Sequence, residues 1–154
     1  MCEFASFFHK PDVDGKPEIC VWDLNSHAET EEKLNLNLSI WQEGHYTPEG
    51  KIELRFNDNF RFDKAKYTEI FKTRFKTFKD FLKWACTQEI GGSLYLSGCD
   101  LRGITLPKKT GGYLYLSGCD LRGITLPEEM GGYLYLSGCN LKGITLPKKI
   151  RIIK

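Results

Sequence analysis

The residues best suited to chemistry lie in the first third of the chain. Cys20 and His27 supply a thiol and an imidazole seven residues apart, the two groups that a cysteine nucleophile and its base require. No third group that would orient the imidazole is evident, so we favour His27 as an ordinary residue in the first turn of a helix. The sequence has no phosphate-binding loop, no His-Glu-x-x-His metal signature and no Gly-x-Ser-x-Gly elbow. We therefore predict no catalytic residue, no metal and no cofactor.

A second group of residues has the composition of a ligand pocket, with aromatic rings and a few polar groups. The group consists of Trp22, Asp23, His27, Trp41, Glu43, His45 and Tyr46. The packed core of a small domain with exposed edges explains the same residues equally well. The sequence leaves both interpretations open.

These residues need strands and helices to position them. The segments "EFASFFHK", "EICVWDL" and "KIELRFN" are rich in aromatic and β-branched residues and predict strands, the first two joined by the turn "DVDGKP". Ser26 and Glu29 have the spacing of a capping box, which predicts a short helix, and a second helix is expected over residues 64–76. Residues 1–89 therefore read as an α+β head domain.

The head is expected to end in a helix that covers the next domain. Thr77 and Asp80 form another capping box, and an apolar stripe follows over about residues 78–88. This helix leads directly into a region of different composition, rich in glycine and leucine. We predict a domain boundary there, with a second domain over residues 90–154.

The second domain is repetitive. The stretch "GGSLYLSGCDLRGITLPKKT" at residues 91–110 recurs with few changes at 111–130 and 131–150. In "YLYLS", Leu114 and Leu116 alternate with polar or aromatic residues, which indicates a strand with one apolar face. Leu121, Ile124 and Leu126 return apolar groups to the same interior. One such coil cannot bury these side chains alone, so the copies are expected to stack.

The pattern Leu-x-Leu-x-x-Cys-x-Leu resembles the leucine-rich repeat, and the short period with its "ITLP" ending is most similar to the repeats of bacterial proteins of that family. The resemblance covers about 60 residues and implies a solenoid. One departure is Gly111, which stands where the family pattern begins with leucine. In the head, "FASF" followed by "SH" resembles a domain of short phage and bacterial proteins of unknown role, which implies no activity. The predicted fold is thus an α+β head followed by a short β-rich leucine-rich-repeat solenoid of about three coils.

Stacking places equivalent residues in columns about 4.8 Å apart. Cys99, Cys119 and Cys139 form a column expected in the core, because a line of cysteines cannot converge on one metal. Asp and Arg columns next to it are expected to pair. A loop column alternates in sign, so opposite charges should face each other across adjacent coils, from Lys108 and Lys109 to Glu128 and Glu129 and on to Lys148 and Lys149.

The outward strand positions bear five tyrosines: Tyr95, Tyr113, Tyr115, Tyr133 and Tyr135. A protein-binding face is one interpretation, since tyrosine gives large and stiff contact area. Stabilisation of the sheet by cross-strand aromatic pairs is the other.

The segment "IRIIK" predicts a fourth strand that has no coil behind it. Ile150, Ile152 and Ile153 are poor residues to leave in water on an open edge. We expect a homodimer in which this edge pairs with that of a second copy; the alternative is that the isoleucines fold back as a cap.

Composition and net charge exclude some classes of function. The chain has 154 residues, 41% hydrophobic and 27% charged, with a net charge of +2, which argues against a nucleic-acid or anionic-membrane partner. The N-terminus does not resemble a signal peptide, so a cytoplasmic location with reduced cysteines is expected. We expect a non-enzymatic protein-interaction module. The alternatives are a phage-encoded small-molecule-binding or sequestering protein with its pocket in the head and, third, an enzyme with an unrecognised site there.

Overall fold

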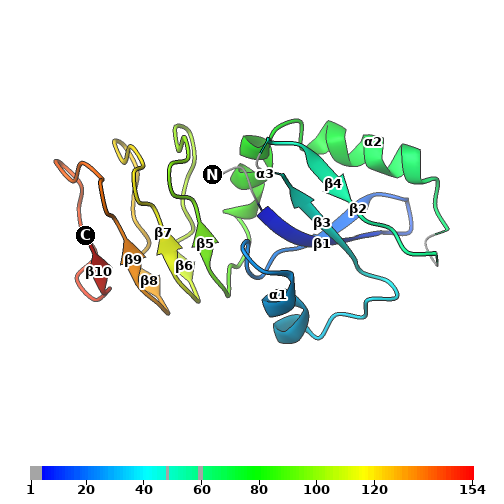
Figure 1. The fold of residues 1–154 in the computed structure, drawn as a ribbon, viewed down its shortest axis with the longest axis horizontal. Coiled ribbons are helices and arrows are strands. Elements are labelled where there is room, and N and C mark those ends of the chain that lie inside the picture. The colour runs from blue at the N-terminus through cyan, green and yellow to red at the C-terminus, as the bar shows by residue number, and fades with distance from the viewer. Residues whose placement is uncertain (1–4, 48, 59–60) are drawn as a thin grey trace. The chain divides into compact units, whose positions relative to one another are not determined.

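The computed structural model describes residues 5–47, 49–58 and 61–154, which form a mixed α and β structure with three helices and thirteen elements in all (Figure 1). The described residues up to Phe81 form one compact unit, and those from Leu82 to Lys154 form another. The division falls inside helix α3 (Phe78–Ala85). None of the helices in these ranges has the length and apolar character to cross a bilayer.

The first unit is built on an antiparallel sheet with strand order β2-β1-β3-β4. The strands are β1 (Ala5–Pro11), β2 (Pro17–Cys20), β3 (Gln42–Tyr46) and β4 (Ile52–Leu54). The predicted turn joins β1 to β2, where Asp12 accepts hydrogen bonds from the backbone N–H groups of Asp14 and Lys16. The three predicted strands are present, and β3 is an additional one.

Helices pack on both faces of this sheet. The ring of Phe7 in β1 lies 5.4 Å from that of Phe71 in α2 (Lys64–Arg74), and the next residue, Phe8, points the other way to His27 in α1 (His27–Leu34), 5.2 Å away. Because successive strand residues face opposite sides, helices on both sides bury β1 continuously over its first five residues. The core of the unit therefore lies on both sides of β1.

Strand β3 was not predicted from its sequence, "QEGHY", which is polar and contains glycine. Its central residue allows close packing: a Cβ at Gly44 would lie 2.4 Å from the ring of Phe7. The glycine thus makes room for an aromatic ring that comes from a strand far away in the sequence.

The helix starts follow local sequence rules. The Ser26 hydroxyl accepts a hydrogen bond from the Glu29 N–H (3.2 Å). Thr77 and Asp80 make the reciprocal bonds of a capping box at 3.1–3.2 Å. Helix α2 ends at Arg74 and α3 at Ala85, slightly earlier than predicted.

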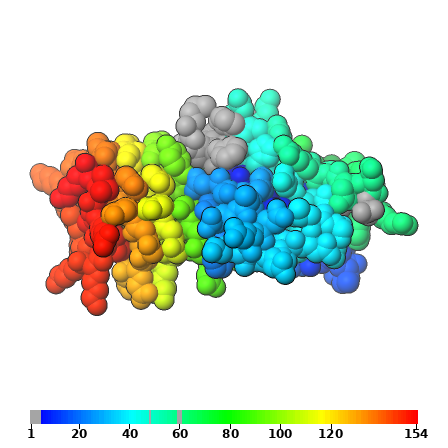
Figure 2. Space-filling model, turned by 60° about the horizontal axis from the view of Figure 1, so that its bottom comes forward, coloured from blue at the N-terminus to red at the C-terminus, as the bar shows by residue number. Residues whose placement is uncertain are grey.

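The second unit contains a parallel sheet in the order β10-β9-β7-β5. Its strands are β5 (Leu94–Tyr95), β7 (Leu114–Tyr115), β9 (Leu134–Tyr135) and β10 (Ile152–Ile153). A second parallel pair joins β6 (Lys109–Thr110) to β8 (Glu129–Met130). Each strand pairs with its equivalent in the next repeat, Leu94 with Leu114 and Leu114 with Leu134. The repeats appear in Figure 2 as adjacent bands running from green through yellow and orange to red.

The interior of this unit holds the leucine columns and the cysteines. Cys99 and Cys119 are buried, and the Cys119 Sγ donates to the carbonyl of Leu96 in the preceding repeat (3.0 Å). Cys139 makes the equivalent bond to Leu116 (3.1 Å) but is partly exposed, so the prediction that all three are buried is wrong for the last. The last coil has fewer neighbours to cover it.

The predicted charge pairing is confirmed in the first two repeats, but among the described residues Lys148 and Lys149 make no ion pair with Glu128 or Glu129. Arg102 and Arg122 each form an ion pair with the aspartate two residues earlier. Lys109 forms an ion pair with Glu129 of the next repeat, at 2.9 Å. The Arg122 guanidinium lowers the pKa of Asp120 to about 2. These groups are exposed, so each pair adds little stability, and only the Lys109–Glu129 pair joins adjacent repeats and so bears on their register.

Candidate interaction surface

The tyrosine face, defined as Tyr95, Tyr113, Tyr115, Tyr133 and Tyr135, lies on the outer side of the parallel sheet. The alternation of each strand sends its leucines inward and its tyrosines outward. Ring centroids are 5.2 Å apart between Tyr95 and Tyr115 and 4.5 Å apart between Tyr115 and Tyr135. The rings of Tyr113 and Tyr133 stack at 5.9 Å, with planes 9° apart. The five rings thus form two ordered columns.

The tyrosine face is open to solvent in part. Tyr95 is 42% exposed and Tyr113 is 40% exposed, whereas the other three are half-buried by their neighbours. Each ring packs against a neighbouring ring of its own column, and part of its surface stays accessible to solvent. The arrangement offers a stiff surface that is both apolar and hydrogen-bonding.

Strand β10 extends this surface. Ile152 pairs with Leu134 and Ile153 with Tyr135, so Ile153 continues a tyrosine column and is 42% exposed. The predicted fourth strand is therefore present, while Ile150 before it is half-buried.

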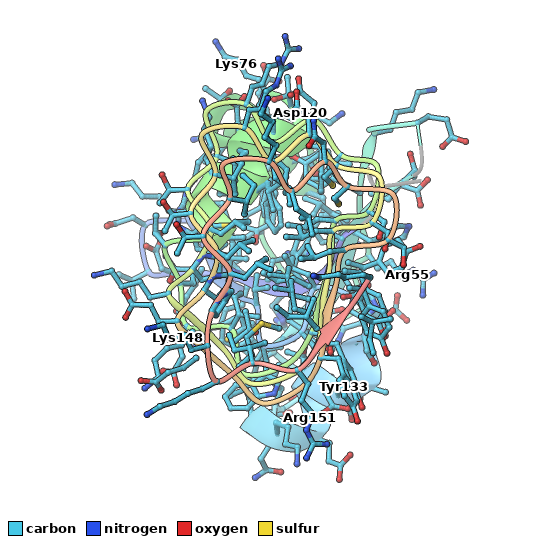
Figure 3. All side chains as sticks on the ribbon, turned by 90° about the vertical axis from the view of Figure 1, so that its left-hand side faces the viewer. Arg55, Lys76, Asp120, Tyr133, Lys148 and Arg151 are labelled. Atoms are coloured by element: carbon cyan, nitrogen blue, oxygen red, sulfur yellow. The ribbon has the colours of Figure 1, made fainter. Side chains whose placement is uncertain are left out.

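Arg151 is a member of the surface that sequence reasoning missed. Its guanidinium carbon lies 5.8 Å from the ring centre of Tyr133, and Nη1 donates to the Tyr133 hydroxyl at 3.3 Å (Figure 3). Its position immediately before the leucine column, where the earlier repeats have Tyr113 and Tyr133, was the available signal.

The proposed cysteine–histidine chemistry gains no support from the geometry. Burial and the nearby Glu18 carboxylate raise the pKa of Cys20, the reverse of what a nucleophilic thiol needs. The His27 Nε2 lies 3.0 Å from the carbonyl oxygens of Phe7 and Gly44. Because carbonyls only accept, this nitrogen carries the hydrogen, and the imidazole ties two strands together. His27 is thus more than an ordinary first-turn residue.

The remaining pocket candidates are engaged in separate contacts. Glu43 pairs with Arg55 at 2.9 Å, and His45 pairs with Glu53 at 3.0 Å. His45 and His27 are brought near each other, with ring centroids 6.5 Å apart. The Trp41 ring lies under the Lys10 ammonium at 4.6 Å.

Two further candidates are fixed by backbone contacts. Asp23 is buried and accepts the Asn25 N–H at 2.6 Å. Tyr46 is buried and donates to the Phe75 carbonyl at 3.0 Å, and burial raises the pKa of its hydroxyl. Tyr46 therefore belongs to the core.

Two buried polar atoms in the same unit have no hydrogen-bond partner among the described residues. They are the Trp22 Nε1, which is a donor, and the Asn25 Oδ1, which is an acceptor. A bound molecule or a water would satisfy them.

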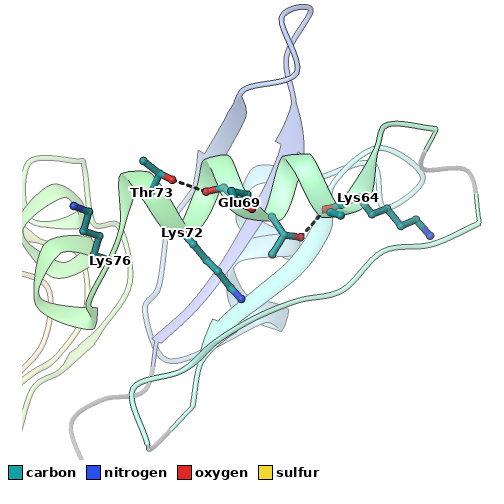
Figure 4. A pocket seen from close by; sticks show the side chains of 7 residues that line it. Lys64, Glu69, Lys72, Thr73 and Lys76 are labelled. Atoms are coloured by element: carbon teal, nitrogen blue, oxygen red, sulfur yellow. Dashed lines mark hydrogen bonds between the residues drawn. The ribbon is translucent and has the colours of Figure 1, made fainter.

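An open groove of about 560 Å³ runs along α2, lined by Lys64, Lys72 and Lys76 with Thr68, Glu69 and Thr73 among them (Figure 4). The two threonine hydroxyls donate to the helix's own carbonyls, at 2.7 and 2.8 Å. The groove thus presents flexible cations and a carboxylate but no fixed donor, which does not make a defined site. Within the described ranges no cluster of three His, Cys, Asp or Glu side chains could hold a metal ion.

Comparisons with protein-family models, with curated proteins and with solved structures found no match to this chain.

Proposed function

We propose that this chain is a non-enzymatic interaction protein, an α+β head followed by a leucine-rich-repeat solenoid of three coils, which acts in the cytoplasm. Its tyrosine face binds a protein partner. The observation that carries the proposal is the pair of stacked tyrosine columns, partly exposed along a parallel sheet. Tyrosine is enriched at the centres of protein interfaces, and stacked rings lose little further freedom on binding.

Cross-strand aromatic stacking also stabilises a sheet by itself, so the experiment must separate binding from stability. A photoreactive benzoylphenylalanine replaces Tyr115 in cells that express the chain. The control places it at Thr125, an exposed residue of the same repeat outside the sheet. We expect a discrete cross-linked species from position 115 and none from position 125.

A second variant then tests the face itself. Tyr113→Ser with Tyr133→Ser removes one stacked column and leaves the other in place. We expect the cross-link from position 115 to disappear while circular dichroism shows a folded protein. Equal cross-linking from both positions, or a cross-link that survives the double substitution, would contradict the proposal.

A ligand-binding head is the second candidate, favoured by the unpaired Trp22 Nε1 and Asn25 Oδ1. Native mass spectrometry of the purified chain should then show a bound small molecule that Trp22→Phe releases, since phenylalanine retains the ring but lacks the N–H. Identical spectra for the two proteins would remove this candidate.

A further inference from the structure

At the β10 edge of the parallel sheet, some backbone groups bond to β9 and others point outward. Within the described residues β10 is the last strand of its sheet. Leu134 of β9 and Leu136, just after that strand, donate to the carbonyls of Arg151 and Ile153, at 2.9 and 2.7 Å. Because backbone groups alternate in direction along a strand, the N–H and C=O of Ile152 point away from β9. These two groups can pair with a strand added at this edge.

The repeat pattern is interrupted at this strand. Leu114 and Leu134 are one period apart, but Leu134 pairs with Ile152, two residues short of the next period. The two missing residues correspond to Gly131 and Gly132. This glycine pair begins each of the three repeats. A Cβ at Gly131 would lie 1.9 Å from the Gly111 carbonyl oxygen, so stacked coils need this glycine. Strand β10 therefore does not begin a further coil of the same geometry.

The last coil is also less covered than the others. Leu101 and Leu121 are buried, whereas the equivalent Leu141 is partly exposed; Leu106 and Leu126 are buried, whereas the equivalent Leu146 is partly exposed. A strand added beyond β10 would cover this apolar interior.

The charged side chains of the last repeat and β10 are all of one sign. Residues 131–154 contain no Asp or Glu but five exposed cations: Lys142, Lys148, Lys149, Arg151 and Lys154. Figure 3 shows Lys148 to the left of the last coil and Arg151 below it. None of the five makes an ion pair with a carboxylate of the described residues. The aspartate that neutralises Arg102 and Arg122 in the earlier repeats is replaced here by Asn140.

The cations at this end favour an acidic segment over a second copy of the chain as the strand that pairs with β10. A second copy of the chain, paired about a two-fold axis, would bring its five cations against the first five, and like charges at an interface oppose pairing. An acidic segment would instead find five unpaired cations, with Arg151 already held in place by Tyr133. Lys154, next in register after Ile153, also opposes self-pairing, since charge on an edge strand commonly does so.

We propose that β10 is a strand-addition site for an extended acidic segment of a protein partner. The segment pairs with the free N–H and C=O of Ile152, places apolar residues over the open end of the last coil and directs carboxylates to Arg151 and its neighbouring lysines. The site rests on the proposed function only in that the chain binds proteins. It does not require the tyrosine face.

The test uses residues 1–154 and a fluorescein-labelled peptide of alternating valine and glutamate, about nine residues long, which is within the usual range of strand lengths. The matched control peptide has lysine in place of glutamate. We expect the acidic peptide to raise its fluorescence anisotropy on binding, to shift the backbone amide resonances of Ile152 and its neighbours, and to bind more weakly at high salt. The lysine peptide should not bind.

Two pairs of variants separate strand addition from simple charge attraction. Ile152→Pro removes the outward N–H without removing a bond to β9, and Ile152→Val retains it; we expect only the first to abolish binding. Arg151→Glu should weaken binding at least about tenfold, whereas Lys108→Glu, the same charge change in the first repeat, should not.

Several outcomes overturn the proposal. Equal binding of both peptides, or binding that survives Ile152→Pro with shifts elsewhere, shows that no strand is added at this edge. Failure of the acidic peptide to bind a monomeric chain refutes the proposal directly. Sedimentation as a dimer that Ile152→Pro dissociates would assign the edge to a second copy, as the sequence alone predicts. Because photo-cross-linking reports on the tyrosine face independently, either proposal can fail without the other.

Discussion

The glycine that begins each repeat gives a sharp test of the stacking. In Gly131→Ala the new Cβ would lie 1.9 Å from the Gly111 carbonyl oxygen, far inside the ordinary contact distance of about 3.5 Å. The coil must move away, which strains two backbone hydrogen bonds, from Gly131 to Thr110 (3.0 Å) and from Gly132 to Gly112 (3.1 Å). Overpacking costs about 1–3 kcal/mol and each exposed hydrogen bond about 0.5. We expect Gly131→Ala to lose about 2–4 kcal/mol.

Gly118→Ala is the matched control in the neighbouring repeat. Gly118 has φ of +74°, but a Cβ there would meet no atom within 4 Å. Only the left-handed backbone is penalised, by about 1 kcal/mol. With roughly 2–4 °C per kcal/mol for a chain of this size, the melting temperature should fall by about 5–15 °C in Gly131→Ala and by about 2–4 °C in Gly118→Ala.

The assay is thermal and urea unfolding followed by circular dichroism, with both variants measured beside the wild type. A Gly131→Ala protein that melts with the wild type, or no earlier than Gly118→Ala, would show that the repeats do not stack at this backbone separation.

Three other predictions concern single side chains. Burial lowers the pKa of His9 to about 4 from 6.5, so the unfolded state takes up a proton first as the pH falls. Protonation linked to His9 should remove about 3 kcal/mol of stability between pH 6.5 and 4, in addition to what other groups remove. Urea titration should therefore show a smaller loss for His9→Gln than for the wild type over that window. His27→Ala should cost about 1–2 kcal/mol at pH 7.5, because it leaves the carbonyls of Phe7 and Gly44 without their shared donor; a cost under about 0.5 kcal/mol would indicate a plain surface residue. Iodoacetamide followed by peptide mass spectrometry should label Cys139 well before Cys119 in the native protein, and equal rates would contradict the difference in burial.

Features that depend on neighbours along the chain could be predicted from the sequence. The capping boxes at Ser26 and Thr77 need only residues three positions apart. The near-identity of the repeats places each leucine opposite its own equivalent, so the columns and the pairing of Lys109 with Glu129 follow from the period. The tyrosine face was for the same reason visible in the sequence.

Features that depend on residues distant in the sequence were decided by the tertiary structure alone. In β3, Gly44 has no side chain where the Phe7 ring packs, and this contact joins residues far apart in the sequence. The His27 imidazole likewise bonds to carbonyls of two strands that are distant from each other in the sequence. The register of β10 skips two residues because Ile152, rather than the residue one full period on, enters the leucine column beside Leu134. Burying an apolar side chain stabilises the sheet, whereas keeping the 20-residue spacing does not by itself. Only the tertiary structure shows which isoleucine takes the position beside Leu134.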